Sequence, residues 1–300
     1  MPARSRADVV GVALAATGAF GYGVTVVVGR DLATTGIGPA SALGLRFSIG
    51  GALLLLFLRV RGARALPSAA ELPKVVLLGA VGYAIESSLF YAALERSTAA
   101  ATALVFYCYP VFVTIIEIVR GNEHPERRTL FALAASVFGT AIVVAAGNRV
   151  AFSAAGVIYT FAAAVTFAVY LLLARDLGKR TDAMTMACWV SLGAGASQLV
   201  RAIATGALHV PGDRALELLT YGGASAVAFL FSFAAMSRIG AARVAVVMTL
   251  EAFSAVVLGA MFLGETVRLV QLLGGVFVLG AAAVIGAGRA RTPEPAEPSP

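Results

Sequence analysis

The segment GVALAATGAFGYGVTVVVGRDL (residues 11–32) has a second copy, GVIYTFAAAVTFAVYLLLARDL (residues 156–177), which begins 145 positions later. Both copies are apolar runs that end in the same Arg-Asp-Leu sequence. An apolar stretch of about 20 residues spans the hydrocarbon core of a bilayer as an α-helix, and a backbone inside lipid must satisfy its own hydrogen bonds. The pair therefore predicts two membrane helices at equivalent places in a duplicated chain.

The composition extends this prediction to the whole chain. Hydrophobic residues make up 59% of the sequence and charged residues 13%, whereas roughly 25% of residues are charged in soluble domains. We expect ten membrane spans, at residues 9–28, 39–58, 72–93, 99–119, 129–147, 154–174, 184–204, 216–236, 242–263 and 267–287. The connections between these spans are too short to fold into a domain outside the membrane.

The duplication also predicts how the two halves are oriented. Further along the chain the copies align at an offset of 142, where Arg96 matches Arg238 and Glu123 matches Glu265. Each copy holds five spans, and because five is odd, the second copy enters the membrane from the opposite side. We therefore expect an all-α membrane protein of two inverted five-helix repeats, residues 9–147 and 154–288, followed by a disordered cytoplasmic tail at 289–300. Inverted repeats are typical of secondary transporters, whose solute site lies near the midplane between the halves.

The net charge of +7 orients the chain in the membrane and does not indicate a nucleic-acid partner. If both termini are cytoplasmic, most lysines and arginines fall in cytoplasmic loops, as the positive-inside rule requires. Arg61, Arg127 and Lys179 are examples. The sequence therefore predicts a multi-pass protein of the cell inner membrane with both termini cytoplasmic. Its expected partners are the lipid bilayer and a small-molecule solute.

Several short motifs resemble those of a known transporter family. They are Arg46-Phe47 in the second span, residues 99–110 with Pro110 in the fourth, and Phe262-Leu263-Gly264-Glu265 ahead of Leu272-Leu273-Gly274-Gly275. With the duplication, they resemble the ten-helix EamA-type members of the drug/metabolite transporter superfamily over residues 9–288. The resemblance implies export or exchange of amino acids or other small metabolites. Because relatives also carry sugars and nucleotide sugars, the resemblance does not identify the solute. The oligomeric state also stays open.

Three charged residues are expected inside the membrane: Arg46, Glu86 and Glu251. Each costs ~2.5–3.5 kcal/mol at a helix centre on insertion scales, so such residues usually serve a function. A midplane carboxylate, Glu251 above all, would bind either a proton or the amine of a solute and so couple transport to protons. Arg46 would hold a carboxylate or phosphate of the solute. The alternative is that a carboxylate pairs with Arg46, or with a serine or a backbone group, only to hold the helices together.

Four uncharged residues complete the expected substrate-binding site: Tyr83, Phe106, Tyr109 and Met248. Tyr83 and Met248 share helix faces with the two carboxylates, and Tyr109 and Phe106 hold the matching positions of the fourth span. Pro110 removes a backbone donor and is expected to bend that span. The alternative for these side chains is packing between helices.

Sequence motifs for other kinds of protein are missing. The chain has no G-x-x-x-x-G-K-[ST] loop that would hydrolyse ATP and no H-E-x-x-H zinc motif. His124 and His209 fall in expected loops, and no nucleophile, base and oxyanion donor can be assembled. We therefore expect a transporter that is not an enzyme, with no cofactor and no metal. Two alternatives stay open, an intramembrane enzyme acting on a lipid-soluble substrate and an importer of a sugar or nucleotide-type solute.

Overall fold

A computed structural model describes residues 3–33, 35–63, 65–97, 99–121, 126–147, 153–264 and 267–286 of the chain. These residues form helices and their connections, and no strand occurs among them. Single helices make seven of the spans: α1 (Ala3–Ala33), α2 (Pro39–Val60), α7 (Arg127–Gly147), α8 (Ala154–Leu177), α9 (Ala183–Ala204), α10 (Ala215–Ile239) and α13 (Leu269–Gly286). The expected tail at 289–300 and the matched pair Glu123 and Glu265 lie outside the described residues.

The other three spans are interrupted helices. The third consists of α3 (Leu72–Leu77), a π-helical segment (Leu78–Tyr83) and α4 (Ala84–Leu94). The fourth consists of α5 (Ala99–Phe106) and α6 (Tyr109–Val119), and the ninth of α11 (Ala241–Met248) and α12 (Leu250–Leu263). Nine spans in the described residues are long and apolar enough to cross a membrane, and the tenth, within α13, is a shorter apolar helix. All ten expected spans are therefore present as helices.

The breaks in the fourth and ninth spans occupy equivalent positions, at Tyr107 and Thr249, 142 residues apart. The first break has the expected cause, since Pro110 lies in the first turn of α6 and lacks a backbone donor. The ninth span has no proline. There the Thr249 hydroxyl donates to the Val246 carbonyl at 2.7 Å, a local bond that competes with regular helix geometry.

Helix packing follows a pseudo-two-fold axis between the repeats. The axis pairs α2 with its own counterpart α9, and α7 with α13. It also relates the packing of α1 on α10 and α12 to that of α8 on α4 and α6. Because equivalent spans cross in opposite directions, this axis runs perpendicular to the helices, within the membrane plane.

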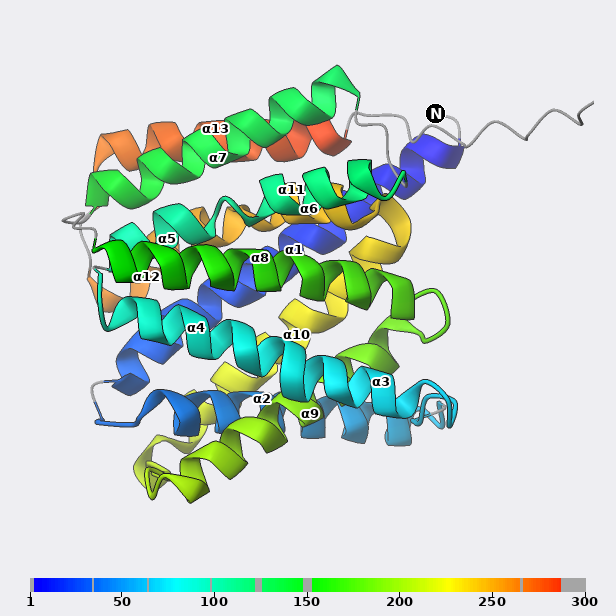
Figure 1. Cartoon of the computed structure of the whole chain (residues 1–300), viewed down its shortest axis with the longest axis vertical. Helices are drawn as coiled ribbons and strands as arrows, with labels where there is room; N and C mark the ends of the chain where they lie inside the picture. The colour runs from blue at the N-terminus through cyan, green and yellow to red at the C-terminus, as the bar shows by residue number, and fades with distance from the viewer. Residues whose placement is uncertain are drawn as a thin grey trace, which may run out of the picture.

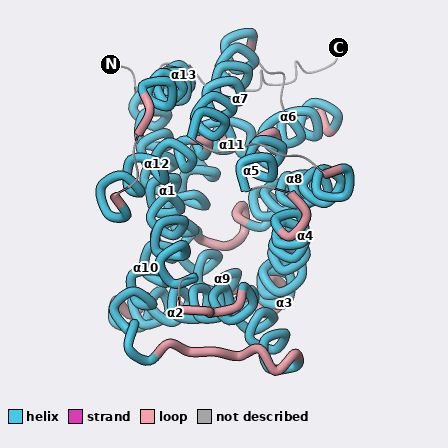
Figure 2. The backbone as a smooth tube through the Cα atoms, turned by 90° about the vertical axis from the view of Figure 1, so that its left-hand side faces the viewer, coloured by secondary structure: helices cyan, strands magenta, loops and turns pink. Residues whose placement is uncertain are grey.

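The central helices form two bundles, which we call bundle A and bundle B. Bundle A comprises the third, fourth and sixth spans (α3–α4, α5–α6 and α8), and bundle B comprises the eighth, ninth and first (α10, α11–α12 and α1). Figure 1 shows the helices side by side, with α7 and α13 at one end of the molecule and α2 and α9 at the other. Viewed end-on, α12, α1 and α10 stand opposite α5, α8 and α4 (Figure 2).

Glycines allow helices to approach one another closely at two of these contacts. A Cβ atom at Gly21 of α1 would lie 3.0 Å from the Ala224 carbonyl of α10. A Cβ at Gly79, in the π-helical segment, would overlap the carbonyl of Val190 in α9. At both positions the neighbouring backbone fills the space that any larger side chain would need, as in other closely packed membrane helices.

We name the two faces of the molecule from the charge prediction. The inner face carries the α2–α3 and α8–α9 connections, including Arg61 and Lys179, and the outer face carries the α1–α2 connection. The orientation of these faces in the cell stays a prediction.

Candidate functional site

The breaks in the fourth and ninth spans meet at a small central pocket between bundles A and B. Ten side chains line this pocket: Tyr22, Tyr109, Phe167, Tyr170, Leu171, Phe229, Ser232, Phe233, Val244 and Met248. Its volume is about 10 Å³, which is room for about one water molecule. The pocket is therefore closed to a metabolite in this structure.

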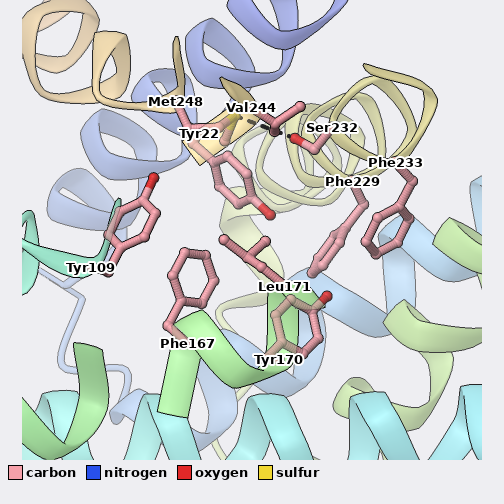
Figure 3. A pocket seen from close by; sticks show the side chains of 10 residues that line it. All are labelled: Tyr22, Tyr109, Phe167, Tyr170, Leu171, Phe229, Ser232, Phe233, Val244 and Met248. Carbon is pink, nitrogen blue, oxygen red and sulfur yellow. Dashed lines mark hydrogen bonds between the residues drawn. The ribbon is translucent and has the colours of Figure 1, made fainter. Parts of the chain in front are cut away.

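Aromatic rings form the walls of the pocket on both sides (Figure 3). From bundle A, Tyr109 and Phe167 have ring centroids 4.8 Å apart, and Phe167 stacks on Tyr170 at 5.8 Å. From bundle B, Tyr22 lies 6.0 Å from Phe229. The Tyr170 hydroxyl is buried and has no hydrogen-bond partner among the described residues, so it is a polar group available to a ligand.

The Tyr109 hydroxyl joins the two bundles at the broken helices. It donates to the carbonyl of Ala245 in α11 at 3.3 Å. Met248, at the end of α11, accepts a hydrogen bond on its sulfur from the Ser232 hydroxyl at 3.4 Å, drawn as a dashed line in Figure 3. The two expected site residues Tyr109 and Met248 thus come from opposite bundles to one pocket.

Arg46 lies in α2 beside Tyr22 and is 8% exposed. Its Nε donates to the Ser225 hydroxyl at 3.0 Å, and its guanidinium carbon lies 4.8, 5.2 and 5.7 Å from the ring centroids of Phe47, Tyr221 and Tyr22. Its Nη2 has no hydrogen-bond partner among the described residues, and no described carboxylate lies within ion-pair distance of it. The ion pair that a purely structural role would use is therefore not formed in this structure.

The two carboxylates lie around the pocket without lining it. Glu86 of α4 is 6% exposed, and Glu251, in the first turn of α12, is half-buried. Each lies within electrostatic reach of Arg46 and Tyr22. The Tyr107 hydroxyl lies beside the Glu251 carboxylate. One guanidinium and two carboxyl groups therefore lie around Tyr22, within the membrane-spanning helices.

The two remaining expected residues support the pocket walls. Phe106 packs against Tyr109 and Phe167, with ring centroids 5.6 and 5.5 Å away. Tyr83 lies 5.6 Å from the rings of both Tyr170 and Phe229. The structure thus gathers all seven expected residues around one centre, with two of them on the pocket surface itself.

Sequence reasoning missed most of the pocket lining. Tyr22, Phe167, Tyr170 and Phe229 are aromatic residues within apolar runs, where packing against other helices or lipid is common. One signal was available, because Tyr22 and Phe167 are 145 residues apart and so occupy equivalent positions. An aromatic residue retained in both copies of a span that faces the repeat interface is a site candidate.

Among the described residues no group of three or more His, Cys, Asp or Glu side chains could hold a metal ion. The free cysteines Cys108 and Cys188 lie in the fourth and seventh spans.

Comparison with known proteins identifies the family. The model of the EamA-like transporter family matches residues 9–145 and again residues 154–287. The chain belongs to the EamA-like transporter family. The paired match accords with the two repeats, and the fold expected from the sequence, ten membrane helices in two repeats, is confirmed. The repeat limits expected from the sequence, 9–147 and 154–288, stay predictions.

Individual relatives of this EamA-like protein are also transporters by name. An uncharacterized transporter of Archaeoglobus fulgidus is 25% identical over 219 residues, which cover 69% of this chain and 74% of the relative. The uncharacterized transporter YcbK of Bacillus subtilis is 25% identical over 222 residues, covering 69% and 70%. A solved crystal structure shares the fold with a TM-score of 0.77 at 20% identity, covering 94% of this chain and 96% of that one. The protein is a multi-pass membrane transporter and not an enzyme, so the intramembrane-enzyme alternative is set aside.

Proposed function

We propose that this EamA-like protein is a secondary transporter that exports or exchanges a small solute carrying both an ammonium and a carboxylate group, such as an amino acid. Arg46 is the observation that carries the proposal, because it is a buried cation in the membrane with an unused donor and no ion-pair partner among the described residues. We further propose that the protein lies in the cell inner membrane with both termini cytoplasmic, as the positive-inside rule predicts.

Arg46 suits the anionic end of such a solute. A buried charge costs several kcal/mol of desolvation unless a partner compensates it, and guanidinium binds carboxylates through paired hydrogen bonds. The orphan Tyr170 hydroxyl near the same ring cluster supplies a second donor. Three rings around the guanidinium hold it in place through cation–π contacts, so it need not reorganise when an anion arrives.

Glu86 and Glu251 suit the cationic end. A carboxylate in the membrane is stabilised by binding a proton or an ammonium group, and the two cations compete for it. This competition can couple solute movement to protons, because proton binding releases the solute and solute binding releases the proton. Glu251 is the better placed of the two, since it stands at the helix break that corresponds to the Tyr109 position of the first repeat.

The closed pocket also supports a cycle with distinct conformations. A space of about 10 Å³ holds no metabolite, because ligand pockets of drug-sized molecules measure about 300–1,000 Å³. Bundles A and B must therefore separate further before a solute binds between the aromatic walls.

The proposal is tested by counterflow in proteoliposomes with four groups of solutes: amino acids, their decarboxylated amines, their N-acetyl derivatives, and sugars or nucleotide sugars. We expect saturable exchange of at least one amino acid, and weak competition by derivatives that lack either charged group. Exchange of amines as fast as of amino acids would contradict the role of Arg46. Saturable exchange of a sugar or nucleotide sugar alone would replace the proposal with the importer alternative.

Arg46→Gln provides the residue-level test. Losing a charge-assisted hydrogen bond worth about 1.5–3 kcal/mol should weaken amino-acid binding roughly ten- to hundredfold, with little change for the decarboxylated amine. Arg61→Gln is the matched control, because Arg61 also stacks on a ring, that of Phe57 at 4.6 Å, but lies exposed at the end of α2. Equal losses for the amino acid and the amine would show that Arg46 only supports the fold.

A further inference from the structure

Among the described residues, the helices of bundles A and B pack most closely on each other at the inner side of the molecule. There α11 of bundle B packs on α6 and α8 of bundle A, and α10 packs on α8. Under the pseudo-two-fold axis, the equivalent pairs at the outer side are α5 with α12, α5 with α1, and α4 with α1. In the described part of the chain, none of these three outer pairs packs as closely as its inner equivalent. The inner and outer sides of the molecule are equivalent by the repeat, but the helices of the two bundles pack differently at the two sides. The described helices of the two bundles are therefore packed more closely at the inner side than at the outer side, as alternating access requires of one of its two end states.

A second cavity lies on the inner side of this closure. Its volume is about 280 Å³, close to the lower end of the range for small-molecule sites. Its lining comes from the end of α8, the α8–α9 connection, the start of α9, the end of α10 and the glycine after it: Ala174, Arg175, Gly178, Lys179, Thr181, Ala183, Met186, Phe233, Met236, Ser237 and Gly240. We call this cavity the inner vestibule.

One side chain belongs to both spaces. Phe233 of α10 lines the central pocket and the inner vestibule, and it is 5% exposed. One turn towards the centre, Phe229 lines the central pocket only, and one turn towards the inner face, Met236 lines the vestibule only. Figure 3 shows the Phe233 ring next to Phe229, at one edge of the lining. Among the described residues, Phe233 is thus the side chain that the linings of the two spaces share.

An ion-pair network holds the wall of the vestibule that α8 forms, across from Phe233 of α10. Arg175 of α8 pairs with Glu117 of α6, whose side chain is fully buried, and with Asp176. Asp176 also accepts from Arg120, which follows α6, at 2.8 Å. These pairs tie the inner ends of α6 and α8 together within bundle A. The position that matches Glu117 in the second repeat is Gly259, so bundle B has no carboxylate there for a corresponding tie.

We propose that Phe233 is the inner gate of this transporter, a ring that separates the central solute pocket from the inner vestibule. Because ion pairs hold α6 and α8 together within bundle A, the contact that opens is the one between the bundles, where α8 packs on α10 and Phe233 lies. Rotation or displacement of this one ring joins the two spaces into a continuous path to the inner face. The gate follows from the placement of the two cavities and holds for any solute, so its test is independent of the amino-acid proposal.

The test measures reagent access to Ser232, which lines the central pocket and is 5% exposed. Ser232→Cys is made in a background with both native cysteines replaced by alanine, and an impermeant methanethiosulfonate reagent is applied to each face of oriented vesicles. Ser237→Cys, in the exposed part of the vestibule, identifies the face on which the vestibule opens. This reference makes the result independent of the predicted topology.

Phe233→Ala should raise the labelling rate of Ser232→Cys from the vestibule face at least tenfold. Phe229→Ala and Met236→Ala are matched controls, because they remove similar apolar bulk on either side of the gate and should leave that rate within about twofold. Phe233→Leu keeps more of the buried volume and should give an intermediate rise, which tests the gate even if the alanine variant does not fold. No rise in either Phe233 variant, or an equal rise in the two controls, would overturn the assignment.

Discussion

Replacing Glu117 with glutamine should destabilise the protein more than any exchange at a surface ion pair. The Glu117 side chain is fully buried, whereas its partner Arg175 is 12% exposed. Glutamine keeps the size and one acceptor of the side chain but removes the charge. Breaking a buried pair by removing one partner typically costs about 3–5 kcal/mol, because the other charge stays behind uncompensated.

The structure places Glu117→Gln at the lower end of this range, at about 3 kcal/mol. Arg175 keeps a second partner, Asp176, at 3.0 Å, so its charge is not left alone. Combining Glu117→Gln with Arg175→Met removes both buried charges. The double variant should therefore be more stable than the sum of the single losses predicts, by about 0.5–3 kcal/mol, as expected for residues in direct contact.

Reversible unfolding by sodium dodecyl sulfate in mixed micelles measures these losses. Trp189 is the only tryptophan of the chain and donates to the Ala65 carbonyl at 2.7 Å, so its fluorescence reports on tertiary structure. Glu95→Gln is the control, because Glu95 and Arg96 form a pair that is 74% and 41% exposed and worth about 0–1 kcal/mol. A Glu117→Gln loss no larger than that of Glu95→Gln would refute the conclusion that the buried pair ties α6 to α8.

Three further predictions concern packing, topology and coupling. Gly79→Ala should lower the free energy of unfolding by about 1–3 kcal/mol in the same assay, because its methyl group would overlap the Val190 carbonyl. Gly82→Ala is the control and should be tolerated, because its nearest new contact is 3.5 Å away. Equal losses of stability in the two variants would contradict the close approach of the helices at Gly79. Gly62→Cys in a cysteine-free background should resist an impermeant thiol reagent in intact cells, and ready labelling there would reverse the predicted orientation. Glu251→Gln should fold and insert normally but lose the pH dependence of solute exchange, and an unchanged pH profile would remove Glu251 from proton coupling.

The sequence alone determined the membrane spans and their duplication. Apolar runs long enough to cross a bilayer must be helical, because lipid offers no hydrogen bonds to the backbone, and this constraint acts on each segment separately. The shared Arg-Asp-Leu endings at residues 30–32 and 175–177 revealed the repeat, and an odd number of spans required its inversion. Pro110 likewise predicted the break in the fourth span, because the effect of a proline on its helix is local.

Only the tertiary structure decided which side chains meet. At the Thr249 break the threonine hydroxyl bonds to a carbonyl of its own helix, and whether a threonine in a helix makes this bond depends on its surroundings. Arg46 could have paired with Glu86 or Glu251 as far as the sequence shows, and the packing of α2 instead leaves one of its donors unused. The place of Phe233 between two cavities depends on how far bundle A stands from bundle B. That distance changes during alternating access while the sequence stays the same, so a single sequence specifies both states and cannot by itself say which contacts belong to each.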